Sequence, residues 1–428
     1  MAASSQARAP RPDGAGPTAR APRSSPPLGA LGLHDGRHDG SHDGSGRRRY
    51  GRAVVDQPDD AQPDADRPED ARAGDARGDG SRTGALPAWP DAPPARDGGT
   101  GSAGDRLLQR LLDVLALEDR GVDERGQDLF AGMSLPQPHG RVFGGQVVAQ
   151  AVVAATRTVG DGRAGEVAPG DPPQPGAGAA RPVHSMHGYF LRAGDSSLPI
   201  TFAVERLRDG RSFSARRVHA LQHDRPILSM IASFQAPADG VDHQVAAPDV
   251  PGPEELRPTV ELLGTPDAPP PWRVPGSLDD AARAWAQRWA SSRPLDLRHV
   301  PEGVLPPGSG QAVWLRTTAP LPDDDALHRA VLAFASDDSL LEPVLTAHGL
   351  TWASRGLRVA SLDHALWWHR PARLDEWLLY RQASPTAVGA RGLATGQVFS
   401  RDGVLVASVA QEGLVRPPRP GAGAGLVG

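Results

Sequence analysis

Three residue types are missing from this chain of 428 residues: cysteine, lysine and asparagine. The absence of cysteine excludes disulfides, thiolate nucleophiles and metal sites built on sulfur. Because no lysine occurs, all 46 strong side-chain cations are arginines. This usage, together with 50 glycines and 44 prolines, indicates a bias toward GC-rich codons. An isolated arginine is therefore weak support for an anion-binding site.

A net positive charge and long apolar runs are also lacking. The formal net charge of -5 argues against a general nucleic-acid binder. No run of about 18 apolar residues occurs, so we expect no membrane span. The N-terminus lacks the apolar core of a secretory signal, and the C-terminus carries no obvious targeting motif. The default expectation is a cytoplasmic protein.

Large apolar residues are nearly absent from residues 1–104, which are rich in Pro, Gly, Asp, Ala and Arg. Such a segment cannot offset its ordering entropy, so we predict a disordered tail. It contains a short repeat in which His34, His38 and His42 are each followed by Asp-Gly. The repeat could bind a metal weakly, but low-complexity drift is the simpler interpretation. Residues 157–181 are predicted to form an exposed loop, and residues 417–428 a second flexible tail.

Two similar halves are predicted between these segments, one over residues 105–237 and one over residues 311–416. Each contains an apolar helix, at residues 147–156 and 324–335, followed by strands with turn residues between them. The expected strands are 183–191, 200–207, 213–222 and 227–235 in the first half, and 313–316, 358–369, 377–384, 389–400 and 404–411 in the second. The Pro-rich segment 238–310 is predicted to be a linker or insertion that carries one short helix at residues 279–291. A short amphipathic helix at residues 107–115 begins the first half.

The two halves also match locally, since residues 224–235 resemble residues 401–411. An internal duplication of a helix-plus-sheet unit is the economical explanation. A long helix wrapped by an antiparallel sheet is the hotdog arrangement, so the predicted α+β fold is a double hotdog. Joining the two sheets edge to edge would remove exposed edges.

Four segments carry a family resemblance. They are Val142-Phe-Gly-Gly-Gln-Val-Val148, residues 184–195 with Tyr189-Phe-Leu-Arg192, residues 209–217 (Asp-Gly-Arg-Ser-Phe-Ser-Ala-Arg-Arg), and residues 363–413. Together they resemble the type II acyl-CoA thioesterases, double-hotdog enzymes that hydrolyse fatty acyl-CoA. The resemblance covers residues 105–415 apart from the insertions. It also suggests that double-hotdog units pair into a homo-oligomer.

The resemblance implies a site in which a carboxylate, a hydroxyl and an amide hold the attacking water. The matching positions are Asp337, Ser361 and Gln411. The family's usual residue at the second position resembles Thr, and Ser offers the same donor and acceptors without the methyl that fixes the rotamer. Among the three, Asp337 is the only ionisable base, so it would be the general base. Such hydrolysis requires no metal and no cofactor.

A structural explanation for Asp337 is a solvated carboxylate just past a helix. A negative charge at a helix C-terminus is unfavourable, which favours a functional role. Taken alone, Gln411 would be an ordinary strand-end amide, and Ser361 alone is even weaker support for a functional site.

Asp363 and His364 suggest a rival hypothesis, an Asp-His dyad that activates a serine nucleophile. Adjacent strand residues point to opposite faces, so the two cannot orient one another locally. Ser361 and Asp363, two residues apart, would share a face, and we expect Asp363 to support the site without contacting the attacking water. His364 and His369 are more simply interpreted as packed histidines. No Gly-x-Ser-x-Gly elbow occurs, which weakens a serine hydrolase.

Two residue sets and two functions stay open. A set of aromatic residues could line an acyl tunnel or belong to the core: Tyr189, Phe190, Trp367, Trp368 and Trp377. A set of arginines could meet the CoA phosphates, but no single one of them can be assigned: Arg192, Arg216, Arg217, Arg370 and Arg391. The alternatives to a thioesterase are an enoyl-CoA hydratase of the same fold and a non-catalytic acyl-CoA-binding protein, since fold does not fix function. A hydratase would need an Asp and a His together on one loop beside a helix, and the sequence shows no such pair.

Overall fold

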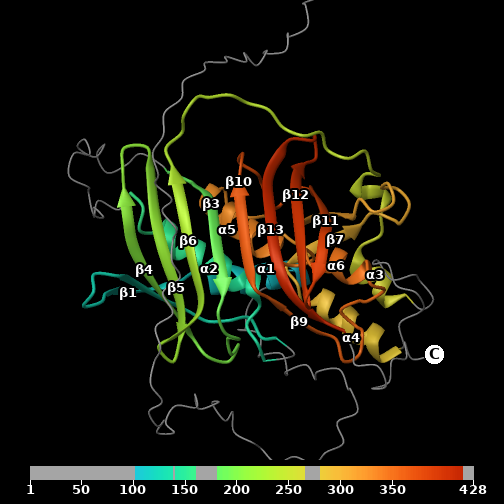
Figure 1. Ribbon diagram of the computed structural model, residues 1–428, viewed down its shortest axis with the longest axis horizontal. Helices are drawn as coiled ribbons and strands as arrows, with labels where there is room; N and C mark the ends of the chain where they lie inside the picture. The colour runs from blue at the N-terminus through green and yellow to red at the C-terminus, as the bar shows by residue number, and fades with distance from the viewer. Residues whose placement is uncertain (1–101, 138–139, 161–180, 266–279, 418–428) are drawn as a thin grey trace, which may run out of the picture. The chain divides into compact units, whose positions relative to one another are not determined.

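The computed structural model describes residues 102–137, 140–160, 181–265 and 280–417. Its main feature is one antiparallel sheet of 13 strands, and Figure 1 shows the helices α2 and α5 on the same side of it. The strand order is β1-β2-β4-β5-β6-β3-β10-β13-β12-β11-β8-β7, with β9 paired to β13. All strands of the first half therefore precede all strands of the second half across the sheet.

The first half of the sheet is built from six strands. They are β1 (Glu118–Val122), β2 (Asp128–Gly132), β3 (Val183–Phe190), β4 (Ile200–Asp209), β5 (Phe213–Gln222) and β6 (Arg225–Gln235). The second half is built from seven. They are β7 (Leu295–His299), β8 (Gln311–Thr317), β9 (Arg358–Ser361), β10 (Asp363–Trp368), β11 (Leu378–Val388), β12 (Arg391–Ser400) and β13 (Leu405–Arg416).

The two halves meet where β3 and β10 pair, with His364 opposite Gly188 and Leu366 opposite Met186. This edge-to-edge pairing satisfies the backbone groups of two strands that would otherwise be sheet edges. The expected arrangement of two helix-plus-sheet units joined edge to edge is thus present in the described residues.

Two helices lie against the sheet and against each other, α2 (Gly144–Thr156) and α5 (Asp325–Ser336). Both are apolar on most sides, as expected for helices that are covered all round. Side chains such as Val148 and Val152 of α2 and Val331 and Phe334 of α5 belong to a single buried cluster that continues across both halves. The two halves therefore share one main core. The remaining helices are α1 (Ala103–Leu115), η1 (Pro253–Glu255), α3 (Thr259–Gly264), α4 (Asp280–Ser291) and α6 (Glu342–Thr346).

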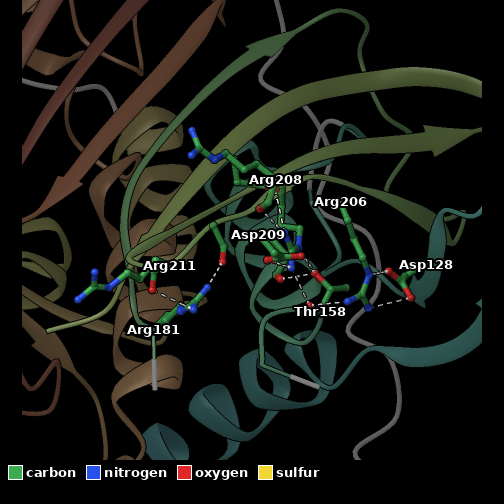
Figure 2. Close-up of polar contacts among 11 residues, drawn as sticks. Asp128, Thr158, Arg181, Arg206, Arg208, Asp209 and Arg211 are labelled. Atoms are coloured by element: carbon green, nitrogen blue, oxygen red, sulfur yellow. Dashed lines mark hydrogen bonds and ion pairs between the residues drawn. The ribbon is translucent and has the colours of Figure 1, made fainter. Parts of the chain in front are cut away.

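The C-terminal end of α2 is held by two arginines of the first half. Arg206 Nη1 and Arg216 Nη2 each donate to the carbonyl oxygen of Thr158 at 3.0 Å. Arg206 also pairs with Asp128 at 2.8 Å (Figure 2). Arg216 pairs with Asp209 at 2.8 Å. Guanidinium groups at a helix C-terminus satisfy its free carbonyls and complement its negative dipole end. The conspicuous 209–217 segment therefore has a structural role at this helix end.

Several elements differ from the sequence-based expectation. The hairpin β1–β2 and the helix α6 were not predicted, and β7 continues the sheet from within the segment expected to be a linker. The expected strand 358–369 is two strands, β9 and β10, with Leu362 between them. Helix α1 begins at Ala103, where the hydroxyl of Ser102 accepts a hydrogen bond from the backbone N–H of Asp105. The rest of the predicted tail, including the His-Asp-Gly repeats, lies outside the described residues.

Within the described ranges, none of the helices combines the length and apolar character needed to cross a membrane.

Candidate active site

Asp337 lies where the two halves of the chain meet. It is the residue that caps the C-terminus of α5, and its Oδ2 accepts a 2.7 Å hydrogen bond from the backbone N–H of Gly145 in the first turn of α2. The residue that precedes α2, Phe143, makes no side-chain cap. The carboxylate of Asp337 thus caps a helix from the other half, as an Asp at an ordinary N-cap would do. Its unfavourable position at the end of α5 is offset by the positive end of α2.

Two glycines allow this close approach. A Cβ on Gly145 would lie 2.5 Å from the carbonyl oxygen of Phe334 and 3.0 Å from Cβ of Asp337. A Cβ on Gly144 would lie 2.8 Å from Asp337 Oδ2 and 3.1 Å from the Phe190 ring. Distances below 3.0 Å are too short for carbon contacts, so the start of α2 needs glycine at both positions. The sequence motif Val-Phe-Gly-Gly-Gln therefore serves the contact between α2 and Asp337.

Gln411 connects the other two predicted site residues. Its Nε2 donates to Asp337 Oδ1 at 2.6 Å and to Ser361 Oγ at 2.8 Å. Gln411 is fully buried on β13, whereas Asp337 and Ser361 are only partly buried, so solvent reaches their side of the cluster. The structure thus brings together the three residues that the sequence predicted.

An irregularity between β9 and β10 decides which side chains face this cluster. Ser361 lies opposite Gly413, but Ala365 lies opposite Ala410, so one extra residue is inserted relative to β13. Such a bulge lets two residues three positions apart share a face. Accordingly His364, opposite the buried Gly188, faces inward with Ser361 and Gln411.

The expectation that Ser361 and Asp363 share a face is wrong, because regular alternation fails at this bulge. Asp363 lies opposite Tyr189, whose side chain is 62% exposed, and it therefore points to the outer face of the sheet. Its Oδ1 accepts a 2.6 Å hydrogen bond from the backbone N–H of Glu412, the residue after Gln411. Asp363 contacts the backbone beside the cluster, and a supporting role for it stays a prediction.

Burial raises the pKa of Asp337 to about 6. Four neighbours oppose this shift: the hydrogen bonds from Gln411 and Gly145, the positive charge of Arg293 and the hydroxyl of Ser361. A carboxyl group that titrates near this value is a usable base at neutral pH, and it is more basic than an exposed Asp.

Sequence reasoning missed Arg293, which follows α4 in the segment expected to be a linker. Its guanidinium is 4.2 Å from the ring centre of Phe143 and 4.3 Å from that of Trp289. Its Nε lies 3.3 Å from Oδ1 of the buried Asp338, the residue after Asp337. Burial raises the pKa of Asp338 to about 6, and the charge of Arg293 opposes that shift. Nothing in the sequence distinguished this arginine from the other 45.

The aromatic set divides between core and surface. Trp368 and Trp377 are buried in two apolar clusters, and Trp367 stacks edge-on against His187. Phe190 is the one member of the set that borders Gly144, next to Asp337. An acyl tunnel lined by the whole set does not fit this distribution.

The five arginines considered for CoA binding all have protein partners. Arg216 is fully buried, and Arg217 and Arg391 pair with Glu205 and Glu412. Arg370 pairs with Asp242, and Arg192 donates to the carbonyl oxygen of Pro226. In the described residues no three His, Asp or Glu side chains converge as a metal site would require.

The fold and the cluster define a class, a hotdog protein with a partly buried carboxylate at the junction of its two units. A solved hotdog protein of unknown function from Alicyclobacillus acidocaldarius has the same fold, with a TM-score of 0.51 and 17% identity over 72% of this chain and 98% of that one. Residues 134–235 match the family described as acyl-CoA thioesterase N-terminal domain, and residues 286–414 match the family described as acyl-CoA thioesterase.

Two relatives are similar over nearly their whole length. Acyl-CoA thioesterase 2 of Haemophilus influenzae is 36% identical over 314 residues, which is 72% of this chain and 98% of that protein. The crystal structure of the acyl-CoA thioesterase II TesB2 from Mycobacterium marinum gives a TM-score of 0.53 at 38% identity, covering 72% of this chain and 98% of that one. This chain belongs to the type II acyl-CoA thioesterase family, and the double-hotdog fold expected from its sequence is confirmed.

Proposed function

We propose that this protein hydrolyses acyl-CoA to a free fatty acid and CoA, with Asp337 as the general base. The main support is the convergence of Asp337, Ser361 and Gln411. The buried amide of Gln411 donates to the carboxylate of Asp337 and to the hydroxyl of Ser361. A carboxylate with a pKa near 6 can accept a proton from water at neutral pH. The relatives' names supply the substrate class.

The reaction follows from this arrangement in two steps. Asp337 removes a proton from a water molecule oriented by Ser361 and Gln411, while the water oxygen attacks the thioester carbonyl carbon. The tetrahedral intermediate then collapses, the carbon–sulfur bond breaks, and the CoA sulfur leaves and takes up a proton. The first turn of α2 leaves backbone N–H groups without helical partners, and these are candidate donors to the carbonyl oxygen.

A covalent mechanism through Ser361 is disfavoured. A serine nucleophile needs an adjacent base that accepts its proton, usually a histidine. Within the described residues the polar partners of Ser361 are the Gln411 amide and the Asp337 carboxylate, and the histidine on the same face, His364, contacts Ser336 instead. Ser361 is therefore better suited to orient water than to attack.

Purified protein incubated with acyl-CoA of several chain lengths tests the function. We expect stoichiometric release of free thiol and free fatty acid. A hydratase would instead add water to enoyl-CoA and release no thiol, and a non-catalytic binding protein would bind acyl-CoA without turnover. Either of these outcomes would contradict the proposal. Hydroxylamine should trap no acyl hydroxamate beyond the uncatalysed rate, since no acyl-enzyme forms.

A homo-oligomeric state and a cytoplasmic location stay predictions. Exposed apolar side chains on the outer face of the sheet, including Tyr189 and Ile231, support association between copies. Light scattering coupled to gel filtration tests the oligomeric state. Cell fractionation tests the location.

A further inference from the structure

Gln411 can hold Asp337 and Ser361 together only when its side-chain amide has one orientation. Both hydrogens of Nε2 are used, one toward Asp337 Oδ1 and one toward Ser361 Oγ. If the amide were rotated by half a turn, its oxygen would lie against the carboxylate, where two negative atoms repel. The orientation of this amide therefore decides whether the cluster forms.

The oxygen of that amide points away from the cluster into a fully buried region. Within the described part of the chain, Gln411 Oε1 receives no well-formed hydrogen bond. A buried carbonyl oxygen without a donor is costly, so the neighbouring side chain on the same face is important. The strand register places His364 of β10 there, beside Gln411 of β13.

His364 is itself fully buried and has one unmatched nitrogen. Its Nε2 lies 2.9 Å from Ser336 Oγ, whereas Nδ1 has no well-formed partner among the described residues. Burial lowers the pKa of His364 to about 4, and a hydrogen bond with the Gln411 side chain opposes that shift. The ring is therefore neutral at physiological pH and carries a single N–H. The two unmatched atoms, His364 Nδ1 and Gln411 Oε1, are complementary only if that hydrogen is on Nδ1.

We propose that His364 is a positioning residue for the hydrolysis proposed above: its Nδ1–H donates to Gln411 Oε1, and its Nε2 accepts from the hydroxyl of Ser336. The hydroxyl of Ser336 also lies 3.0 Å from the carbonyl oxygen of Ala333, so it can turn to either acceptor. Tyr380 fixes the backbone at this position, since its hydroxyl donates to the carbonyl oxygen of Ser336 at 2.9 Å. A chain of contacts thus runs from α5 through His364 to the amide that aligns the base. With the hydrogen on Nε2 instead, two acceptors would face each other in a buried site.

A matched pair of substitutions separates the two ring nitrogens. The amide of His364→Asn lies near the position of Nδ1 and can still donate to Gln411. The longer side chain of His364→Gln places its amide near the position of Nε2, where it keeps the contact with Ser336 only. We expect H364Q to lower kcat about tenfold with little change in KM, because a misplaced group slows the chemical step, and H364N to stay within a few-fold of wild type. Equal losses in both variants, or a larger loss in H364N, would overturn the proposal.

A double-mutant cycle with Gln411→Ala asks whether His364 acts through the amide. Once the amide is removed, H364Q should have no further effect on kcat. Independent, multiplicative losses would show that His364 does not act through Gln411.

The tautomer can also be read in the unaltered protein. In protein with 15N-labelled histidine, the ring resonances of His364, assigned by their disappearance in H364Q, should show the hydrogen on Nδ1. A hydrogen on Nε2 contradicts the proposal whatever the activities of the variants. This measurement does not depend on turnover, so it remains informative if the wild-type protein releases no thiol and the proposed function fails.

Discussion

The backbone N–H of Gly145 donates a 2.7 Å hydrogen bond to Oδ2 of Asp337, although the two residues are 192 positions apart and belong to different halves of the duplicated chain. The proposed base therefore gains this hydrogen bond only where both hotdog units are present. The first unit contributes a helix N-terminus, and the second contributes the carboxylate, the hydroxyl and the amide.

Substitution of Gly145 by Ala should disrupt this junction. The new Cβ would lie 2.5 Å from a backbone oxygen of α5, which cannot move without shifting that helix. Overpacking of this kind costs about 1–3 kcal/mol of unfolding free energy. We expect G145A to unfold at lower urea concentration and to lose more activity than its stability loss explains.

Gly240 provides the matched control, since nothing lies within 4 Å of the position of its Cβ. G240A should change the unfolding free energy by less than about 0.5 kcal/mol. If G145A behaved like G240A, the close approach of α2 and α5 would not be required.

The hydroxyl at position 361 should matter more than the identity of the residue. Ser361 Oγ accepts from Gln411 Nε2 at 2.8 Å, and Thr offers the same oxygen with a more restricted rotamer. We expect S361T to retain activity and S361A to lose about 100-fold in kcat, the cost of a poorly oriented reactant. Steady-state thiol release measures both. A fully active S361A would remove the hydroxyl from the mechanism.

Much of this arrangement could be predicted from the sequence, and the reasons for the rest are physical. Asp337, Ser361 and Gln411 lie in motifs that are distinctive over many consecutive positions, so the resemblance selected three residues that the structure brings together. The inward position of His364 could not be predicted, because regular alternation predicts the opposite face and a bulge leaves no clear mark in the sequence. Gly145 lies in the distinctive segment 142–148, but its partner Asp337 is in the other half, and nothing in the sequence links the two. Arg293 is hidden by an arginine-rich composition and by its place in a segment expected to be a linker.

Arg293 should influence the pH at which activity is lost on the acidic side of the pH–rate profile, which is called the acidic limb below. Its positive charge lowers the pKa of Asp337, against the larger effect of burial. Removal of the charge is expected to raise that pKa further, so the limb of kcat/KM should move to higher pH. The comparison of R293M/D338N with D338N tests this, because the two variants differ only in the charge of Arg293, and neither leaves the Asp338 carboxylate buried without its partner, a change that can cost about 3–5 kcal/mol.

Arg316 is a suitable control for that variant. It also stacks on an aromatic ring, 4.4 Å from the centre of Trp377, but it is not among the charges that act on Asp337. R316M should leave the limb in place. An unshifted limb in R293M/D338N relative to D338N would show that Arg293 does not influence the base.

Asp337 should reduce stability at neutral pH. Because burial raises its folded-state pKa to about 6 from an unfolded value of 3.8, the folded chain holds the proton more tightly between these values. Stability is therefore lost as the pH rises through this window, by at most roughly 3 kcal/mol for a shift of about two units. Asn cannot ionise, so the stability of D337N should improve relative to wild type between about pH 4 and pH 7. Urea unfolding at pH 4 and at pH 7 measures the difference in unfolding free energy between D337N and wild type. A difference that is the same at both pH values would contradict a raised pKa of Asp337 in the folded protein.

The central claim is that Asp337 activates water for attack on an acyl-CoA thioester, and D337N tests it most directly. Free thiol release by wild type and D337N should be compared at saturating acyl-CoA, alongside binding of a non-hydrolysable thioether analogue. Loss of the general base predicts a fall in kcat of about 100-fold to 10,000-fold with binding of the analogue preserved. Release of thiol by D337N at the wild-type rate, with the protein folded and the analogue bound, would contradict the account.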